Sequence, residues 1–168
     1  SWNKPDLVAE DKNIYFTPNT VTSQSDTFSI HFTTRNFAKA VRDTFRVTIT
    51  RTYPDGTDSV YTLYRSRCYY SDTLSLTMKA GGLAGAGVNK FNVKVDLNPD
   101  VIPEIEDFTN NQASASLFIY SSDITPVYPP KYAIHPYSTV TLKASTVNPL
   151  GPTRNYKFEI DTAYFNDN

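Results

Sequence analysis

The sequence predicts an all-β protein, an antiparallel β-sandwich of about seven strands. Two observations carry this prediction. Short segments alternate apolar and polar residues with a period of two, and turn residues such as proline, glycine and asparagine separate them. No stretch repeats its apolar residues with the 3.6-residue period of a helix. Because each strand has one apolar face, that face must be covered by a second sheet.

The first half of the sandwich is expected to hold four strands. Residues 4–8 form a short edge strand, since a proline is tolerated at the start or edge of a sheet. A second short strand, residues 14–17, ends at Pro18. Residues 27–34 and 45–50 show the cleanest alternation, with apolar side chains on one face at Phe28, Ile30, Phe32, Phe45, Val47 and Ile49.

The second half of the sandwich begins with a turn. Residues 53–57 contain Pro-Asp-Gly, which predicts a hairpin because proline presets φ and glycine accepts a positive φ. Residues 80–87 are a glycine-rich loop, and residues 98–111 are an acidic, turn-rich loop. The remaining strands are expected at residues 59–64, 73–78, 90–97 and 112–119.

Beyond residue 120 the character of the sequence changes. Four prolines make residues 121–138 a stiff linker. Residues 139–168 then hold two strands, 140–144 and 156–160, as a hairpin extension of the sandwich or as the start of a truncated second β domain. Since two strands alone are marginally stable in water, we expect this hairpin to pack on the sandwich or on another chain.

Composition and charge exclude several classes of protein. The 168 residues carry a net charge of −1 with no basic stripe, so we expect no nucleic-acid partner. The longest apolar runs are too short to cross a bilayer, so we expect no membrane insertion of this chain. Cys68 is the only cysteine, which excludes an intrachain disulfide and a cysteine-rich metal site. Because the chain begins with Ser1, we expect it to be part of a longer protein.

The acidic loop is the first candidate site, because Ca²⁺ takes six to eight oxygen ligands on a turn. Its spacing does not match an EF-hand loop. In the alternative that we favour, Asn110 and Asn111 bond to the backbone where the last strand begins, and no cofactor is bound. The calcium candidates are Asp96, Asp100, Glu104 and Asp107.

Two further features could indicate an enzyme. A cysteine peptidase needs a thiolate beside a histidine, and Cys68 could meet His31 or His135. Neither a small-residue elbow nor a helix start accompanies Cys68, so we expect a packed cysteine. Residues 81–87 lack the Gly-Lys-Ser/Thr ending of a phosphate-binding loop. We therefore expect no catalytic residues.

Tyrosines near the predicted hairpin form the last candidate site. They could make a platform for a sugar or a partner protein, because tyrosine combines an apolar body with a polar tip. Cross-strand packing is the alternative that we favour. The candidates are Tyr61, Tyr64, Tyr69 and Tyr70.

Two segments resemble known families. Lys4-Pro5-Asp6-Leu7-Val8, Val-Asp-Leu-Asn-Pro-Asp at residues 95–100, Ile-Pro-Glu at 102–104 and Asp-Phe-Thr-Asn-Asn at 107–111 resemble the CARDB module, a cell-adhesion-related bacterial domain. The resemblance covers residues 4–120 and implies an immunoglobulin-like sandwich. Residues 140–149 and 155–162 resemble a segment of gingipain-like, C25-family surface proteins. That resemblance implies an exported parent linked to type IX secretion, with a cysteine-peptidase domain elsewhere.

These features and resemblances favour a non-catalytic structural, adhesion or docking module of a large bacterial surface protein. One alternative is an accessory domain that packs on a cysteine-peptidase domain of the same parent and stabilises it. The other is a carbohydrate-binding module. The expected partners are neighbouring domains of the same polypeptide, surface proteins and glycans. The expected location is extracellular, or the outer-membrane surface of a Gram-negative bacterium.

Overall fold

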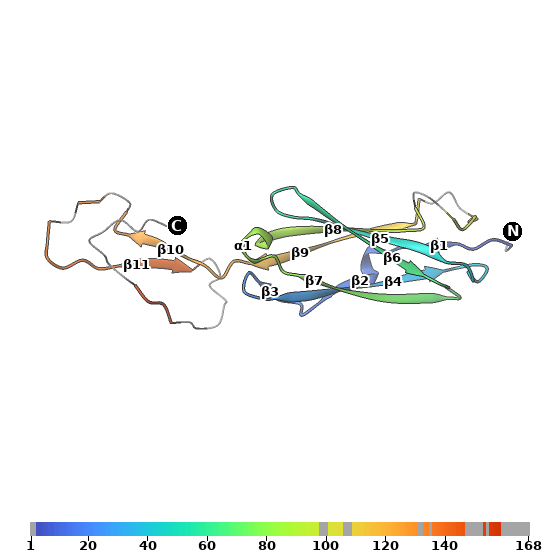
Figure 1. Ribbon diagram of the computed structural model, residues 1–168, viewed down its shortest axis with the longest axis horizontal. Coiled ribbons are helices and arrows are strands. Elements are labelled where there is room, and N and C mark those ends of the chain that lie inside the picture. Colours follow the sequence, from blue (N-terminus) through green and yellow to red (C-terminus); the bar gives the residue numbers. More distant parts are fainter. Residues whose placement is uncertain are drawn as a thin grey trace. The chain divides into compact units, whose positions relative to one another are not determined.

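The computed structural model divides the chain into two units, Ser1–Ser121 and Ser122–Asn168. The structure describes residues 3–97, 101–105, 109–130, 133–134, 136–146, 153 and 155–158. Figure 1 shows the strands of the first unit in two layers. The fold class predicted from the alternation is therefore confirmed for this unit.

The first sheet is built around its longest strand. β4 (Thr27–Asn36) pairs along its length with β7 (Ser71–Lys79) in antiparallel register, with His31 opposite Ser75. Its other edge is shared by β1 (Leu7–Val8) and β2 (Ile14–Thr17), which pair with different parts of β4. The edge strand predicted at residues 4–8 is thus shorter than expected.

The second sheet has five strands, in the order β3, β9, β8, β5, β6. Its members are β3 (Val21–Thr22), β5 (Phe45–Thr52), β6 (Asp58–Arg65), β8 (Gly87–Val95) and β9 (Gln112–Tyr120). The expectation of a purely antiparallel sandwich is wrong at one edge, because β3 runs parallel to β9. The sequence could not predict β3, since a strand of two residues is too short to show the alternation of apolar and polar residues.

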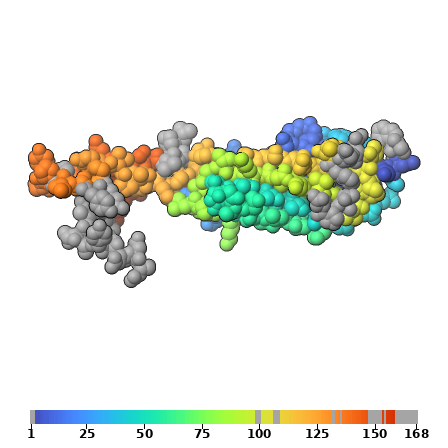
Figure 2. All heavy atoms as spheres, turned by 90° about the horizontal axis from the view of Figure 1, so that it is seen from above, coloured from blue at the N-terminus to red at the C-terminus, as the bar shows by residue number. Residues whose placement is uncertain are grey.

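The core lies between the inner faces of the two sheets. Phe28 on β4, Phe45 on β5 and Val93 on β8 belong to one buried cluster, as the alternation predicts. Phe28 and Phe91 meet edge to face with ring centroids 6.0 Å apart. Figure 2 shows the β5–β6 hairpin, in teal, on the surface of this unit.

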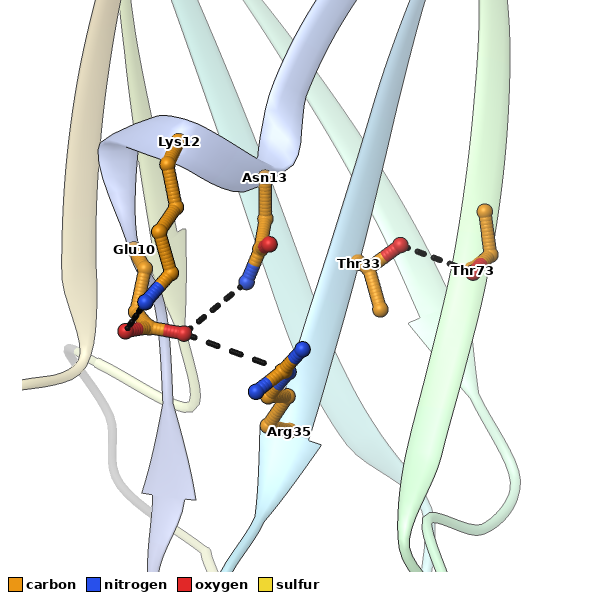
Figure 3. A network of polar contacts seen from close by, with 6 residues as sticks. All are labelled: Glu10, Lys12, Asn13, Thr33, Arg35 and Thr73. Carbon is orange, nitrogen blue, oxygen red and sulfur yellow. Dashed lines mark hydrogen bonds and ion pairs between the residues drawn. The ribbon is translucent and has the colours of Figure 1, made fainter.

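Two short helical segments interrupt the strands. The glycine-rich loop contains one helical turn, α1 (Gly82–Gly85), which the sequence does not predict. It follows Gly81, which has a left-handed backbone with φ +95°. A 3-10 turn, η1 (Asp11–Asn13), joins β1 to β2. In Figure 3 the carboxylate of Glu10, just before η1, bonds to Lys12 and Asn13 and pairs with Arg35 of β4.

The second unit corrects two expectations. β10 (Ile124–Tyr128) lies inside the segment expected to be a linker without elements. It pairs with β11 (Lys143–Thr146), which was expected to form a hairpin with residues 156–160. Of that expected strand, residues 156–158 are not in a strand, and residues 159 and 160 lie outside the described residues. Pro126 is tolerated within β10 because a two-stranded sheet has only edges, and the register shifts beside it.

Candidate functional site

The acidic loop begins at a buried aspartate. Asp96 follows β8, is fully buried and has a left-handed backbone with φ 50°. Its Oδ2 accepts hydrogen bonds from the backbone amides of Val101 at 3.0 Å and Ile102 at 2.6 Å. Its own amide donates to the carbonyl of Arg46 at 2.7 Å. Asp96 therefore folds the loop back against the end of the second sheet.

Glu104, also buried, ties the start of the chain to the acidic loop. Its Oε2 accepts the Leu7 amide of β1 at 2.5 Å, and its Oε1 accepts Nδ2 of Asn111 at 2.6 Å. The same Nδ2 donates to the carbonyl of Val95, the last residue of β8, at 3.1 Å. Burial raises the pKa of Glu104 to about 7, and the hydrogen bonds from Asn111 and Leu7 oppose that rise.

The described part of this loop does not fit a calcium site. Ca²⁺ needs six to eight free oxygens, whereas Asp96 Oδ2 and both oxygens of Glu104 face N–H donors. Oδ1 of Asn110 and Oδ1 of Asn111 are buried and accept no hydrogen bond, but two amide oxygens do not make a calcium site. Among the described residues, no group of three or more His, Cys, Asp or Glu could hold a metal ion. The candidates Asp100 and Asp107 lie outside the described residues.

The cysteine and the histidine of the peptidase hypothesis lie apart. Cys68 is buried, and desolvation raises the pKa of its thiol to about 11. Its carbonyl accepts a hydrogen bond from Asn36, the last residue of β4. His31 stands five residues before Asn36 on that strand, so about 16 Å of strand separates these two residues. The packed cysteine that we expected is what the structure shows. His135 lies outside the described residues.

The four candidate tyrosines do not share one surface. Tyr61 packs against the core from β6, whereas Tyr64, three residues later, faces the other way and is 69% exposed. Tyr69 and Tyr70 are exposed in the connection between β6 and β7. The structure therefore separates Tyr61 from the other three.

A residue that sequence reasoning missed holds the glycine-rich loop. Arg51 is fully buried on β5, and its guanidinium donates to the carbonyls of Lys79 and Ala80. It lies 4.2 Å from the ring centroid of Tyr53, in cation–π geometry. The parity of β5 could have placed it, because Arg51 shares the inward face with Ile49. Arg51 therefore fixes the point where β7 (Ser71–Lys79) enters the glycine-rich loop.

Solved structures share this arrangement of strands. The crystal structure of the CARDB domain of a Pyrococcus furiosus protein, in complex with di-metal ions, matches with a TM-score of 0.50 and 19% identity. The match covers 70% of this chain and 90% of that chain. An NMR structure of the same domain gives the same TM-score and identity and is covered over 96% of its length.

The sandwich has the CARDB fold. A domain of a Methanosarcina acetivorans protein described as a cell surface protein also matches, with a TM-score of 0.48, 20% identity, and 69% and 92% of the two chains covered. No protein-family model matches the chain, and no curated protein matches it significantly.

The CARDB fold bears out one of the two resemblances seen in the sequence. These comparisons do not support the gingipain-like resemblance of residues 140–149 and 155–162. At 19% identity the likeness shows a fold and leaves the activity open. Within the described residues, no helix is long and apolar enough to span a bilayer.

Proposed function

We propose that this CARDB-fold domain is a non-catalytic spacer and docking module of an exported bacterial cell-surface protein. The observation that carries the proposal is the path of the chain through the sandwich. The chain enters at one end and leaves at the other, so the domain adds its own length between its neighbours.

Hydrogen bonds at the two ends of β9 mark this path. Near the start of β9, the amide of Ala9 donates to the carbonyl of Asn110 at 2.8 Å. At its far end, the amide of Ser23 donates to the carbonyl of Tyr120, where the chain leaves the first unit. The nine residues of β9 span about 30 Å between these points. Figure 1 shows β1 and the end of β9 toward opposite ends of the first unit.

The groups that could carry chemistry support a structural role. Glu104 joins β1 to the start of the last strand, and Asp96 fixes the loop between β8 and β9. Cys68 is buried with a raised pKa, which leaves little thiolate at neutral pH. Each of these side chains holds backbone or packs in the core, as in a rigid spacer.

The exported location rests on the sequence. The resemblance of residues 4–120 to CARDB modules supports a cell-surface parent. An experiment tests this proposal directly. Antibodies raised against the chain should label intact cells of the source organism. Labelling only after the cells are lysed would contradict the exported location.

A further inference from the structure

A groove of about 430 Å³ lies where the edge strand of the first sheet approaches the second sheet. One wall comes from β2 and from the crossing that leads to β3, and the other comes from β9. Its volume lies in the range of small-ligand sites, which is about 300–1,000 Å³. Its aromatic lining residues are Tyr15, Phe16, Phe118 and Tyr120.

Three of these rings are unusually open to solvent. Tyr15 is 54% exposed, Phe118 is 49% exposed and Tyr120 is 37% exposed. Phe118 and Tyr120 meet edge to face, with ring centroids 4.9 Å apart. Single exposed apolar side chains are ordinary on a protein surface, but several rings around one hollow indicate a binding site.

The ring of Tyr15 is held in place from behind. It stacks on His31 with centroids 4.6 Å apart and an interplanar angle of 14°. Both nitrogens of His31 are themselves bonded, Nδ1 to Oγ of Ser75 and Nε2 to Oγ1 of Thr17, each at 2.6 Å. A ring fixed in this way loses little entropy when a ligand packs on it.

The polar residues that line the groove indicate whether its ligand is charged. Asn19, Thr20 and Ser116 supply one amide and two hydroxyls, and none of the described residues that line the groove is charged. An ionic ligand would find no counter-charge there, whereas an uncharged one rich in hydroxyls would find partners.

We infer that this groove binds a neutral oligosaccharide. The C–H faces of sugar rings would pack on Tyr15 and Phe118, and sugar hydroxyls would bond to Asn19 and Ser116. The site differs from the tyrosine platform expected near β6, because β6 and β9 lie on opposite sides of β8 and β5 in the second sheet. The inference does not rest on the spacer function.

Solution NMR of the full 168-residue chain tests it. Amide shifts are followed while neutral hexasaccharides of glucose, mannose and xylose are added one at a time, with an oligogalacturonate as the acidic comparison. At least one neutral sugar should shift resonances of β2 and β9. Tyr15→Ala and Phe118→Ala should each weaken its binding about tenfold or more.

Matched variants separate loss of the ring from loss of the fold. Tyr15→Phe keeps the ring and should retain binding, and Tyr64→Ala removes an even more exposed ring on β6 and should leave binding unchanged. Because the replaced side chains are exposed, amide spectra of all variants should stay native. Binding of no neutral sugar, binding of the acidic sugar alone, or shifts centred on Tyr64 would each overturn the inference.

Discussion

Arg51 donates from both Nε and Nη2 to one neutral oxygen, Oδ1 of Asn89, at 3.0 and 2.8 Å. Both side chains are fully buried. Desolvation lowers the pKa of Arg51, and the partners that hold it are the carbonyls of Lys79 and Ala80, the Asn89 amide and three aromatic rings. A buried cation in the core is therefore stabilised by dipoles and π-faces.

Asn89→Ala should be strongly destabilising. It removes the oxygen that accepts two hydrogen bonds from Arg51, and a hydrogen bond to a charged group contributes about 1.5–3 kcal/mol. Urea unfolding measures the loss of free energy. Asn92→Ala, half-buried on the same strand, is the matched control and should change stability by less than about 1 kcal/mol. Equal losses for the two variants would show that Arg51 does not depend on Asn89.

Gly85→Ala tests the packing of α1 on Arg51. A Cβ at Gly85 would lie 2.0 Å from the carbonyl oxygen of Ala80, which also accepts a bond from Arg51. We expect a loss of about 3 kcal/mol, because the backbone must move to relieve the overlap. At Gly82 a Cβ meets nothing within 4 Å and only its φ of +58° is unfavourable, so Gly82→Ala should cost about 1 kcal/mol. A thermal melt that ranks the two variants the other way would contradict this packing.

Glu104 should make the domain less stable as the pH rises through its titration range. Its pKa is about 7 in the folded protein against an ordinary 4.5, so the native state binds the proton more tightly than the unfolded chain. This contribution is fully present below pH 4.5 and is lost as the pH rises to about 7. It amounts to about 3 kcal/mol at most.

Urea unfolding of wild type and Glu104→Gln between pH 4 and 8 measures this contribution as a difference. The difference in unfolding free energy should shift by a few kcal/mol across that window. Glu10→Gln is the control, because the pKa of half-buried Glu10 is lowered, chiefly by its hydrogen bond with Lys12. A difference that stays constant with pH would mean that Glu104 titrates normally.

Calcium should leave the stability of the domain unchanged. The described carboxylates of the acidic loop are bonded to N–H groups and offer no cluster of free oxygens. Melting temperatures in EDTA and in millimolar calcium chloride should therefore agree within about 1 °C. A rise of several degrees with calcium, removed by EDTA, would show a site and contradict this interpretation.

Alternation in the sequence predicted the strands that bury one face. β2, β4, β5, β6, β7, β8 and β9 all lie where that pattern places them. It could not find β3, whose two residues are positioned by pairing with the distant β9. Nor could it find β10, because Pro126 lies inside this strand and a proline argues against a strand. The proline is tolerated here because a two-stranded sheet has only edge strands.

The candidate sites were harder to predict, because they depend on contacts between distant residues. The acidic residues at Asp96 and Glu104 looked like ligands, yet their partners Ile102, Leu7 and Asn111 are set by the fold. The buried position of Arg51 could have been predicted, since the alternation along β5 places its side chain on the inward face. The groove could not have been predicted from the sequence, because Tyr15 and Phe118 lie more than a hundred residues apart and come from different sheets.

A distance measurement across the first unit tests the spacer claim most directly. In a Cys68→Ala background, spin labels at Lys4→Cys and Gln24→Cys mark the two ends, since Gln24 follows the residue bonded to Tyr120. Double electron–electron resonance should give one narrow distribution centred beyond about 30 Å, the length of β9. A broad distribution, or a mean below about 20 Å, would show that the chain does not enter and leave at opposite ends of a rigid sandwich.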